Sequence, residues 1–531
     1  FSDYLTNPNE HDFFLSLVTD EEVAGMIKKL SISKSSGPNS FPTKIMKNST
    51  AALSAPIANL INMSFQEGCF PDLLKIANVC PIHKKNDKNK CENYRPISLL
   101  SNISKLFEKA MYNRIYAFLD NSKQFYELQF GFRNKHSTNH ALISIIEEIK
   151  HNLDNKTFSC GVFIDLEKAF DTVNHDILLQ KLQHYGIRGI SNSWFHSYLN
   201  SRKQKVSLNG VSSSDRDVTC GVPQGSILGP LLFLLYINDM HSAVKYSKIH
   251  HFADDTNLLC SDNNIKQLRN KMNKDLELIY IWLCANRLSL NVSKTEFIIF
   301  RPPNKNLENR VTLKLNKTTL FESNKIKYLG LLLDSRLTWK HHIYELRKKL
   351  GSSIGIIYSM NKMKCPKRLL VSLYYSLFHS HLSYGISVWG NARNEYLDTL
   401  RLMQKRAIRL ITSSDFHAST SELFRDTKIL KLDDIFTHQL SCLMWDQDHR
   451  DLPQCFDHFF TKTSDVHSHY TRQSDKLALS HRINTDRYGK TMFRHTGVMT
   501  LNAIKSLDFY STANSRNTFK FKYKNYLLQK Y

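Results

Sequence analysis

The feature that most constrains the fold of this chain is a short apolar segment at residues 159–164. The segment is partly β-branched and uncharged, which is typical of a β-strand buried on both faces. Two further apolar segments, residues 249–253 and 257–260, meet at Asp254 and Asp255, and this pattern predicts a hairpin. A strand buried on both faces needs neighbours in a sheet and covering layers, so these segments predict an α+β region.

Helical periodicity surrounds this middle region. Residues 12–30 predict a helix, with Asp20 as its cap and Val23, Met26 and Ile27 on one face. The chain after Trp339 is expected to be mostly helical. We predict further helices at residues 57–65, 98–119 and 265–286, and further strands at 296–300, 311–315 and 326–333.

Composition indicates the kind of partner. The 531 residues include 72 Lys and Arg against 48 Asp and Glu, a formal net charge of +24. Such an excess favours a polyanionic partner, either nucleic acid or an anionic membrane surface. The longest apolar stretch, Leu231 to Ile237, is far shorter than the roughly 20 residues of a membrane span. The first residue is Phe1 and not Met, from which we expect a piece of a longer protein.

Cysteine usage predicts a reduced, intracellular protein. Ten Cys in 531 residues are too sparse for a disulfide scaffold, and no CxxC pair occurs. The residues Cys442, His449, Cys455 and His458 lie close together in the sequence, but their gaps fit no zinc site. We interpret that group as chance clustering.

Three carboxylates stand at the ends of predicted strands. Asp165 follows the strand at 159–164, and Asp254 and Asp255 occupy the tip of the predicted hairpin. An isolated Asp at such a place is usually a turn or cap residue. Together, however, these carboxylates form a hard-oxygen group suited to Mg²⁺, and two such ions support nucleotidyl transfer.

Residues 34 to 340 resemble the reverse transcriptase domain of non-LTR retrotransposons, that is, LINE-type elements of the jockey kind. The resemblance rests on seven blocks that follow one another in the family's order. They are Asn93 to Leu100 (fingers motif), Leu128 to Arg133 (the next motif), Phe163 to Asp171 (motif A), Gly221 to Pro230 (motif B), Phe252 to Asp255 (motif C), Leu290 to Phe300 (motif D) and Tyr328 to Gly330 (motif E). The loop Lys34 to Asn39 departs from related sequences, which usually carry Asp at the last position.

The resemblance implies a metal-dependent active site. Asp165, Asp254 and Asp255 match the family's catalytic and metal-binding carboxylates, which would hold two Mg²⁺ ions, with Mn²⁺ as a possible substitute. Lys294 matches a position that could protonate the pyrophosphate leaving group.

The resemblance also implies substrate-binding residues. Phe170 matches the position whose ring excludes a ribose 2′-OH, and Gln224 matches a contact to the incoming nucleotide and the template. Arg95 and either Lys84 or Lys85 match residues that hold the triphosphate. For the two lysines, which belong to a basic run, a solvated surface charge is the alternative.

The implied architecture is an α+β right-hand polymerase with fingers, an antiparallel palm sheet and a thumb. An N-terminal helical extension (1–80) would lead into fingers and palm (81–340, with motifs A to E at 158–333). A helical thumb (341–420) and a basic C-terminal region of unknown fold (421–531) would follow.

The function that the resemblance implies is RNA-directed DNA polymerisation from a 3′-OH primer. The partners would be an RNA template, a DNA primer or RNA–DNA hybrid, and deoxynucleoside triphosphates, without a membrane. A ribonucleoprotein in the cytoplasm, and the nucleus during integration, are the expected locations. Two alternatives remain open: a catalytically silent or domesticated RNA-binding relative, and an intron maturase-like protein.

Overall fold

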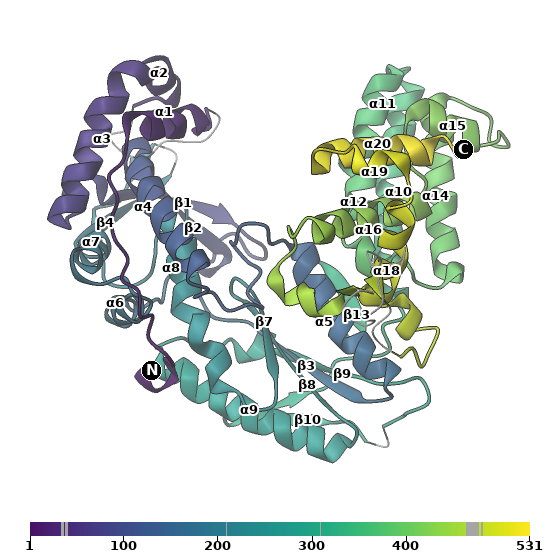
Figure 1. Cartoon of the computed structure of the whole chain (residues 1–531), viewed down its shortest axis with the longest axis horizontal. Helices are drawn as coiled ribbons and strands as arrows, with labels where there is room; N and C mark the ends of the chain where they lie inside the picture. Colours follow the sequence, from purple (N-terminus) through teal and green to yellow (C-terminus); the bar gives the residue numbers. More distant parts are fainter. Residues whose placement is uncertain (33–36, 38–40, 209, 308, 463–476, 479–481) are drawn as a thin grey trace.

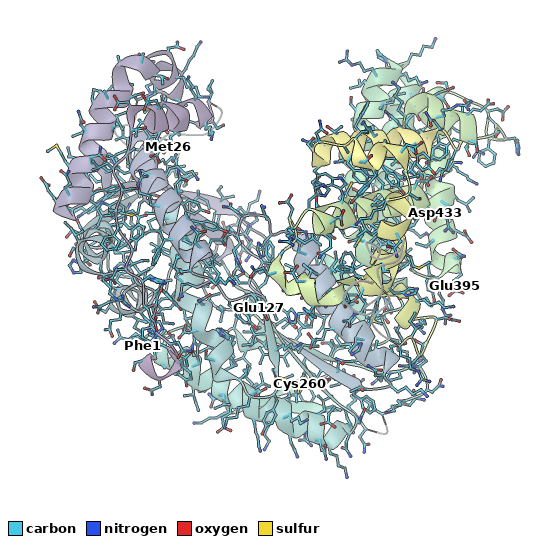
Figure 2. All side chains as sticks on the ribbon, viewed as in Figure 1. Phe1, Met26, Glu127, Cys260, Glu395 and Asp433 are labelled. Carbon is cyan, nitrogen blue, oxygen red and sulfur yellow. The ribbon has the colours of Figure 1, made fainter. Side chains whose placement is uncertain are left out.

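The computed structural model describes residues 1–32, 37, 41–208, 210–307, 309–462, 477–478 and 482–531. The chain forms a U (Figure 1). Helices from the N-terminal part make one limb, helices from the C-terminal part make the other, and β-sheets lie between them toward the base. Met26 lies near the tip of the first limb, Asp433 lies in the second, and Glu127 lies between the limbs (Figure 2).

A four-stranded antiparallel sheet forms the base of the molecule. Its strand order is β7-β8-β3-β9, with β3 at Phe158–Ile164, β7 at Lys248–Phe252, β8 at Asp255–Asp262 and β9 at Glu296–Phe300. The central strand β3 pairs with β8 on one side and with β9 on the other. The predicted strand at residues 159–164 and the predicted hairpin are therefore confirmed.

The sheet separates two hydrophobic cores. Alternate residues of β9 point to opposite faces, so that Phe297 and Ile299 join one core while Ile298 and Phe300 join the other. Helix α9 (Ile265–Ala285) contributes to the first core, and helix α5 (Thr138–Asp154) contributes to the second. These two layers explain why β3 carries no charged residue.

A second sheet lies closer to the N-terminal limb. Its strand order is β2-β1-β4-β5, and β6 also pairs with β4. The bounds are Ile76–His83 for β1, Tyr94–Leu99 for β2, Arg202–Leu208 for β4, Val211–Ser212 for β5 and Arg216–Val218 for β6. β1 and β2 form an antiparallel hairpin, whereas β1 and β4 are parallel.

The N-terminal helices agree with the predicted pattern apart from their ends. Helix α1 spans Asp20–Lys29, and its cap is Thr19, whose hydroxyl accepts a hydrogen bond from the Glu22 amide at 3.2 Å. The prediction of Asp20 as the cap is wrong, because Asp20 is already the first residue of the helix. The prediction of a helix from residue 12 is also wrong, because α1 begins only at Asp20. The other helices are α2 (Thr43–Asn48), α3 (Thr50–Glu67), α4 (Asn102–Asn121), α6 (His175–His184), α7 (Gly189–Leu199) and α8 (Leu228–Ile237).

Two short hairpins follow the four-stranded sheet. The first consists of β10 (Thr312–Leu315) and β11 (Thr318–Phe321), and the second of β12 (Lys325–Tyr328) and β13 (Leu331–Asp334). Residues 326–333, predicted as one strand, are therefore two. The chain reverses at Leu329 and Gly330, both of which have positive φ, a conformation in which a strand cannot continue.

The C-terminal limb is helical. It contains α10 (Lys340–Lys362), α11 (Lys367–Leu373), α12 (Ser380–Ser383), α13 (Ile386–Trp389), α14 (Asn394–Thr412), α15 (Ser421–Thr427), α16 (Leu432–Asp448), α18 (Phe493–Ile504), α19 (Asp508–Ser511) and α20 (Arg516–Leu528). Residues 421–531, for which the sequence predicts no fold, thus contain helices of this limb. Within the described residues, no helix combines the length and apolar composition needed to cross a bilayer.

The C-terminal segment packs on the sheet through α5. Three charged residues of α5 at helical spacing, Glu147, Lys150 and Asp154, are all buried. Lys150 Nζ donates to the Thr491 carbonyl at 2.8 Å, and Asp154 accepts from the hydroxyl of Thr485 at 2.6 Å. The buried polar face of α5 is therefore satisfied by residues more than 300 positions later in the chain.

Candidate active site

The three candidate carboxylates lie at one end of the four-stranded sheet. In the pairing of β3 with β8, Ile164 is opposite Thr256, so Asp165 and Asp255 each lie one residue beyond that pair. Asp254 belongs to the tight turn between β7 and β8, which Phe252 and Asp255 close. Sheet pairing thus brings together residues that are about ninety positions apart in the sequence.

A glutamine and a glycine from another segment hold this turn. Gln129 Oε1 accepts hydrogen bonds from the Ala253 amide at 3.1 Å and from the Gly131 amide at 2.8 Å. A Cβ atom on Gly131 would lie 2.3 Å from the Ala253 nitrogen, so only glycine fits there. The sequence reasoning gave neither residue a role, although a glycine inside a motif block is a signal for close backbone approach.

Charge repulsion acts between the carboxylates. Both Asp254 and Asp255 are exposed to solvent, yet partial burial raises the pKa of Asp254, and the charge of Asp165 raises it further. Burial, followed by the charges of Asp254 and Asp165, raises the pKa of Asp255 to about 6. A cation placed among these oxygens would relieve the repulsion.

Two basic residues of the β1–β2 hairpin counter this negative charge. Lys84 lowers the pKa of both Asp254 and Asp255, and Arg95 lowers that of Asp254. The Lys84 amide donates to the Asn93 carbonyl at 2.8 Å, which places Lys84 directly after the hairpin pairs. Lys84, Lys85 and Arg95 are all exposed. Among the described contacts, Lys84 and Arg95 lower a carboxylate pKa, and Lys85 does not.

Lys294 pairs with the first carboxylate. Its Nζ lies 3.2 Å from Asp165 Oδ2, and the two side chains are 53% and 41% exposed. The Asn291 amide also donates to the Asp165 carbonyl at 2.9 Å. The segment before β9 therefore contacts Asp165 through both the Asn291 amide and the Lys294 side chain.

Phe170 belongs to the segment that follows β3, and Gln224 lies against that segment. The Phe170 ring stacks on Phe233 at a centroid distance of 4.5 Å. Gln224 Nε2 donates to Asp171 Oδ1 at 2.9 Å, and the Gln224 carbonyl accepts from the Ser98 amide at 2.7 Å. Asp171 thus orients Gln224, a role that the sequence reasoning missed.

The donor set fits a divalent metal, although it is not assembled as a finished cage. In the described part of the chain, no three His, Cys, Asp or Glu side chains are gathered closely enough to hold an ion already. The mutually repelling oxygens of Asp165, Asp254 and Asp255 are hard donors of the type that Mg²⁺ prefers. These donors suit a divalent metal. To bind the metal, the Asp165 carboxylate would have to give up its ion pair with Lys294.

The region that contains these residues matches a known protein family. Residues 82–333 match the family model described as reverse transcriptase (RNA-dependent DNA polymerase). The match includes the end of β1, all of β2 and all three carboxylates. Residues 82–333 are therefore similar to reverse transcriptase domains.

The chain is also similar to individual proteins from mobile elements. The chain is 29% identical over 450 residues to the RNA-directed DNA polymerase from mobile element jockey of Drosophila melanogaster, covering 81% of this chain and 48% of that protein. It is also 29% identical to the probable RNA-directed DNA polymerase from transposon BS of the same species, over 80% of this chain and 48% of that protein. A Pol polyprotein from type-1 element R1 of Bradysia coprophila is 27% identical over 70% of this chain and 37% of its own length. The chain spans about half the length of the first two relatives.

Proposed function

We propose that this chain is an RNA-directed DNA polymerase of a non-LTR retrotransposon. The observation that carries the proposal is the convergence of Asp165, Asp254 and Asp255 at one end of an antiparallel sheet. The similarity of residues 82–333 to reverse transcriptase domains and the named relatives support the same reading.

The carboxylates would hold two divalent ions, Mg²⁺ or in its place Mn²⁺. Asp165 and Asp254 would supply the main oxygens, and Asp255 would assist. When bound, such ions activate an attacking 3′-hydroxyl and stabilise the leaving oxygen. Lys294, which lies beside Asp165, would donate a proton to the pyrophosphate.

Other side chains would select and orient the nucleotide. Lys84 and Arg95 carry exposed charges near the carboxylates and would bind the triphosphate, while Lys85 is the weaker candidate. Phe170, fixed by its stack on Phe233, would exclude a ribose 2′-OH. Gln224, oriented by Asp171, would contact the sugar and the template.

The architecture can be described in polymerase terms under this proposal. The four-stranded sheet would be the palm, the β1–β2 hairpin and N-terminal helices the fingers, and the helices from α10 to α14 the thumb. The template, a DNA primer or hybrid, and deoxynucleoside triphosphates would be the partners. A cytoplasmic ribonucleoprotein that acts in the nucleus during integration fits that activity.

The test is primer extension on a homopolymer RNA template with Mg²⁺. We expect the wild-type protein to incorporate deoxynucleotides, and Asp254→Asn to reduce the rate by at least about 10³-fold, because removing a metal ligand removes transition-state stabilisation. Asp217→Asn, on the exposed strand β6, is the matched control and should retain the wild-type rate.

The alternative of a silent RNA-binding relative gives a different result. It predicts RNA binding without nucleotide incorporation by the wild-type protein. Equal incorporation by wild type and Asp254→Asn would instead exclude the assigned metal site.

A further inference from the structure

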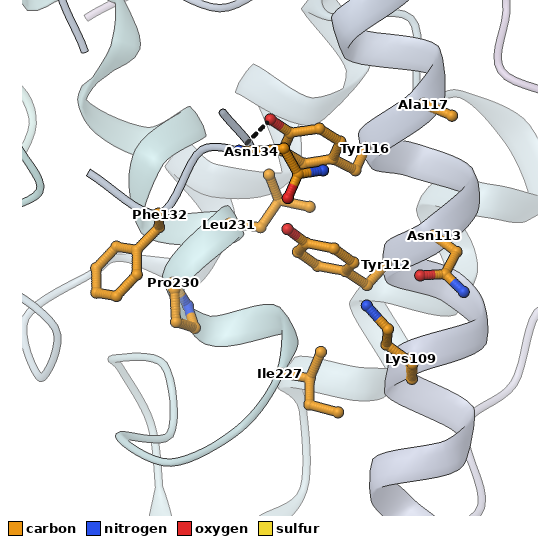
Figure 3. Close-up of a pocket in the computed structure, with 10 residues that line it drawn as sticks. All are labelled: Lys109, Tyr112, Asn113, Tyr116, Ala117, Phe132, Asn134, Ile227, Pro230 and Leu231. Atoms are coloured by element: carbon orange, nitrogen blue, oxygen red, sulfur yellow. Dashed lines mark hydrogen bonds between the residues drawn. The ribbon is translucent and has the colours of Figure 1, made fainter. Parts of the chain in front are cut away.

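A pocket of about 560 Å³ lies between α4 and the start of α8 (Figure 3). Lys109, Tyr112 and Asn113 of α4 form one wall. The opposite wall comes from Phe132, Asn134 and the residues around Pro230. The volume is within the range of small-ligand sites.

The lining offers rings, amides and one cation. The Phe132 ring is 51% exposed, so it presents an open aromatic face. Lys109 Nζ lies 4.4 Å from the centre of the Tyr112 ring, and in the described part of the chain no carboxylate forms an ion pair with it. The side chains of Asn113 and Asn134 add hydrogen-bonding groups at the rim (Figure 3).

The aromatic wall is held rigidly. Tyr112 stacks on Tyr116 at a centroid distance of 5.5 Å, and the Tyr116 hydroxyl accepts a hydrogen bond from the Asn134 amide at 2.8 Å. The Tyr112 hydroxyl extends from α4 toward Leu231 (Figure 3). Burial raises the pKa of Tyr112 to about 12, so this hydroxyl stays protonated and can donate.

Residues that line the pocket contact, or lie next to, residues of the candidate active site. Phe132 contacts Phe170 edge-to-face at a centroid distance of 6.2 Å. Its neighbour Gly131 packs against the turn that carries Asp254. On the same wall as Phe132, Ile227 and Pro230 follow Gln224 within the same motif. A ligand here would lie next to the reacting end of the nucleic acid.

We propose that this pocket binds the base of one unpaired nucleotide in the strand that passes the active site. An aromatic face beside a cation is the usual means of binding single-stranded nucleic acid without sequence preference, since every base can stack. Phe132 supplies the face, Lys109 attracts the adjacent phosphate, and the amides of Asn113 and Asn134 contact the base edge. This inference rests on the proposed function, because it assumes that a template or primer strand lies along the site.

The test uses 2-aminopurine, a base whose fluorescence changes on stacking. It is placed at successive positions of a single-stranded 5′ template overhang in one arm, and at an unpaired 3′ primer nucleotide in the other. The full-length chain is added at saturating concentration without nucleotides. We expect a change at one position, and its loss in Phe132→Leu; the arm in which it occurs identifies the strand.

Three further variants guard against misfolding as the explanation. Lys109→Gln keeps the stem that covers Tyr112, and should weaken binding of the strand that gives the signal by about tenfold. Lys274→Ala, at an exposed site on α9, and Phe321→Leu, at an exposed ring on β11, are the matched controls and should bind as the wild type does. Equal signals from wild type, Phe132→Leu and Lys109→Gln would overturn the inference.

Failure of the pocket assignment can be distinguished from failure of the proposed polymerase function. A wild-type protein that extends primers but gives no pocket-dependent signal contradicts the pocket assignment alone. A pocket-dependent signal without primer extension contradicts the polymerase proposal and leaves a nucleotide-binding site.

Discussion

Gly131 lies where no side chain can fit. A Cβ atom there would lie 2.3 Å from the Ala253 nitrogen and 3.0 Å from its Cα, and both are backbone atoms that cannot rotate away. Gly131→Ala must therefore displace the turn that carries Asp254, at an expected cost of about 1–3 kcal/mol in unfolding free energy. We expect primer extension to fall by more than tenfold, measured together with thermal unfolding.

Gly355 provides the matched control for this substitution. It lies within α10, and a Cβ atom there would meet nothing within 4 Å. Gly355→Ala should stabilise the protein by about 0.5–1 kcal/mol through helix propensity and leave extension unchanged. Normal extension by Gly131→Ala would contradict the role assigned to this contact.

Asp255 is expected to destabilise the metal-free protein at neutral pH. Its pKa is raised to about 6 from 3.8, so the folded state binds its proton more tightly than the unfolded state does. The protein is therefore most stable at pH values below the pKa that Asp255 has in the unfolded state, and its stability decreases as pH rises from there through about 6. Because the side chain is exposed, solvent screening reduces the effect to about 1 kcal/mol.

The measurement compares Asp255→Asn with wild type by thermal unfolding in a chelator. The variant should be the more stable at pH 7.5 and equal at pH 4. A difference of the same size at both pH values would show that the effect is not electrostatic.

At the scale of elements, α5 joins the sheet to the C-terminal helices. The Glu147 carboxylate, 1% exposed, accepts from the Phe493 amide at 2.6 Å and from Arg494 Nε at 2.7 Å. The Glu147 carboxylate therefore caps the N-terminus of α18. The N-cap residue of α18, Met492, makes no capping hydrogen bond with its side chain. A carboxylate from one helix thus satisfies the first amides of another.

Glu147→Ala should leave a partly buried Arg494 and these amides without their partner. Breaking such a pair costs about 3–5 kcal/mol, so we expect a lower midpoint of urea unfolding and faster proteolysis near α18. Glu395→Ala removes the exposed pair with Arg393, whose atoms are 3.7 Å apart, and should change stability by less than about 0.5 kcal/mol. Similar effects from both variants would argue against α5 as the anchor.

At the scale of the whole molecule, the net charge of +24 predicts binding that depends strongly on salt. Exposed basic residues gather on α10, on α11 and in the turn between these helices, and they include Lys348, Lys349, Lys362, Lys364, Lys367 and Arg368. If they contact six to ten phosphates, affinity for an RNA–DNA hybrid should fall about 10³-fold or more between 50 and 200 mM salt.

Fluorescence anisotropy at several salt concentrations measures this slope. Lys364→Ala and Lys367→Ala should each reduce the slope by about one, whereas Lys266→Ala on α9 should leave it unchanged. A slope near zero for the wild-type protein would exclude phosphate contacts as the main source of affinity.

The sequence by itself determined the local features of this protein. Strand β3 could be recognised because a strand buried on both faces must be uncharged, and α9 because its apolar residues recur at helical spacing. Asp165, Asp254 and Asp255 could be proposed as a group because carboxylates at the ends of predicted strands together form a hard-oxygen set suited to Mg²⁺. These features depend on a few neighbouring residues, which a pattern can represent.

Only the tertiary structure decided which distant residues meet. Gln129 and Gly131 at the turn, Asp171 beside Gln224, and Glu147 beneath Arg494 are contacts across about 50 to 350 positions. The ends of α1 and the division of residues 326–333 into two strands also depended on caps and positive φ angles. Long-range pairing follows from how complete surfaces pack, and no local periodicity encodes it.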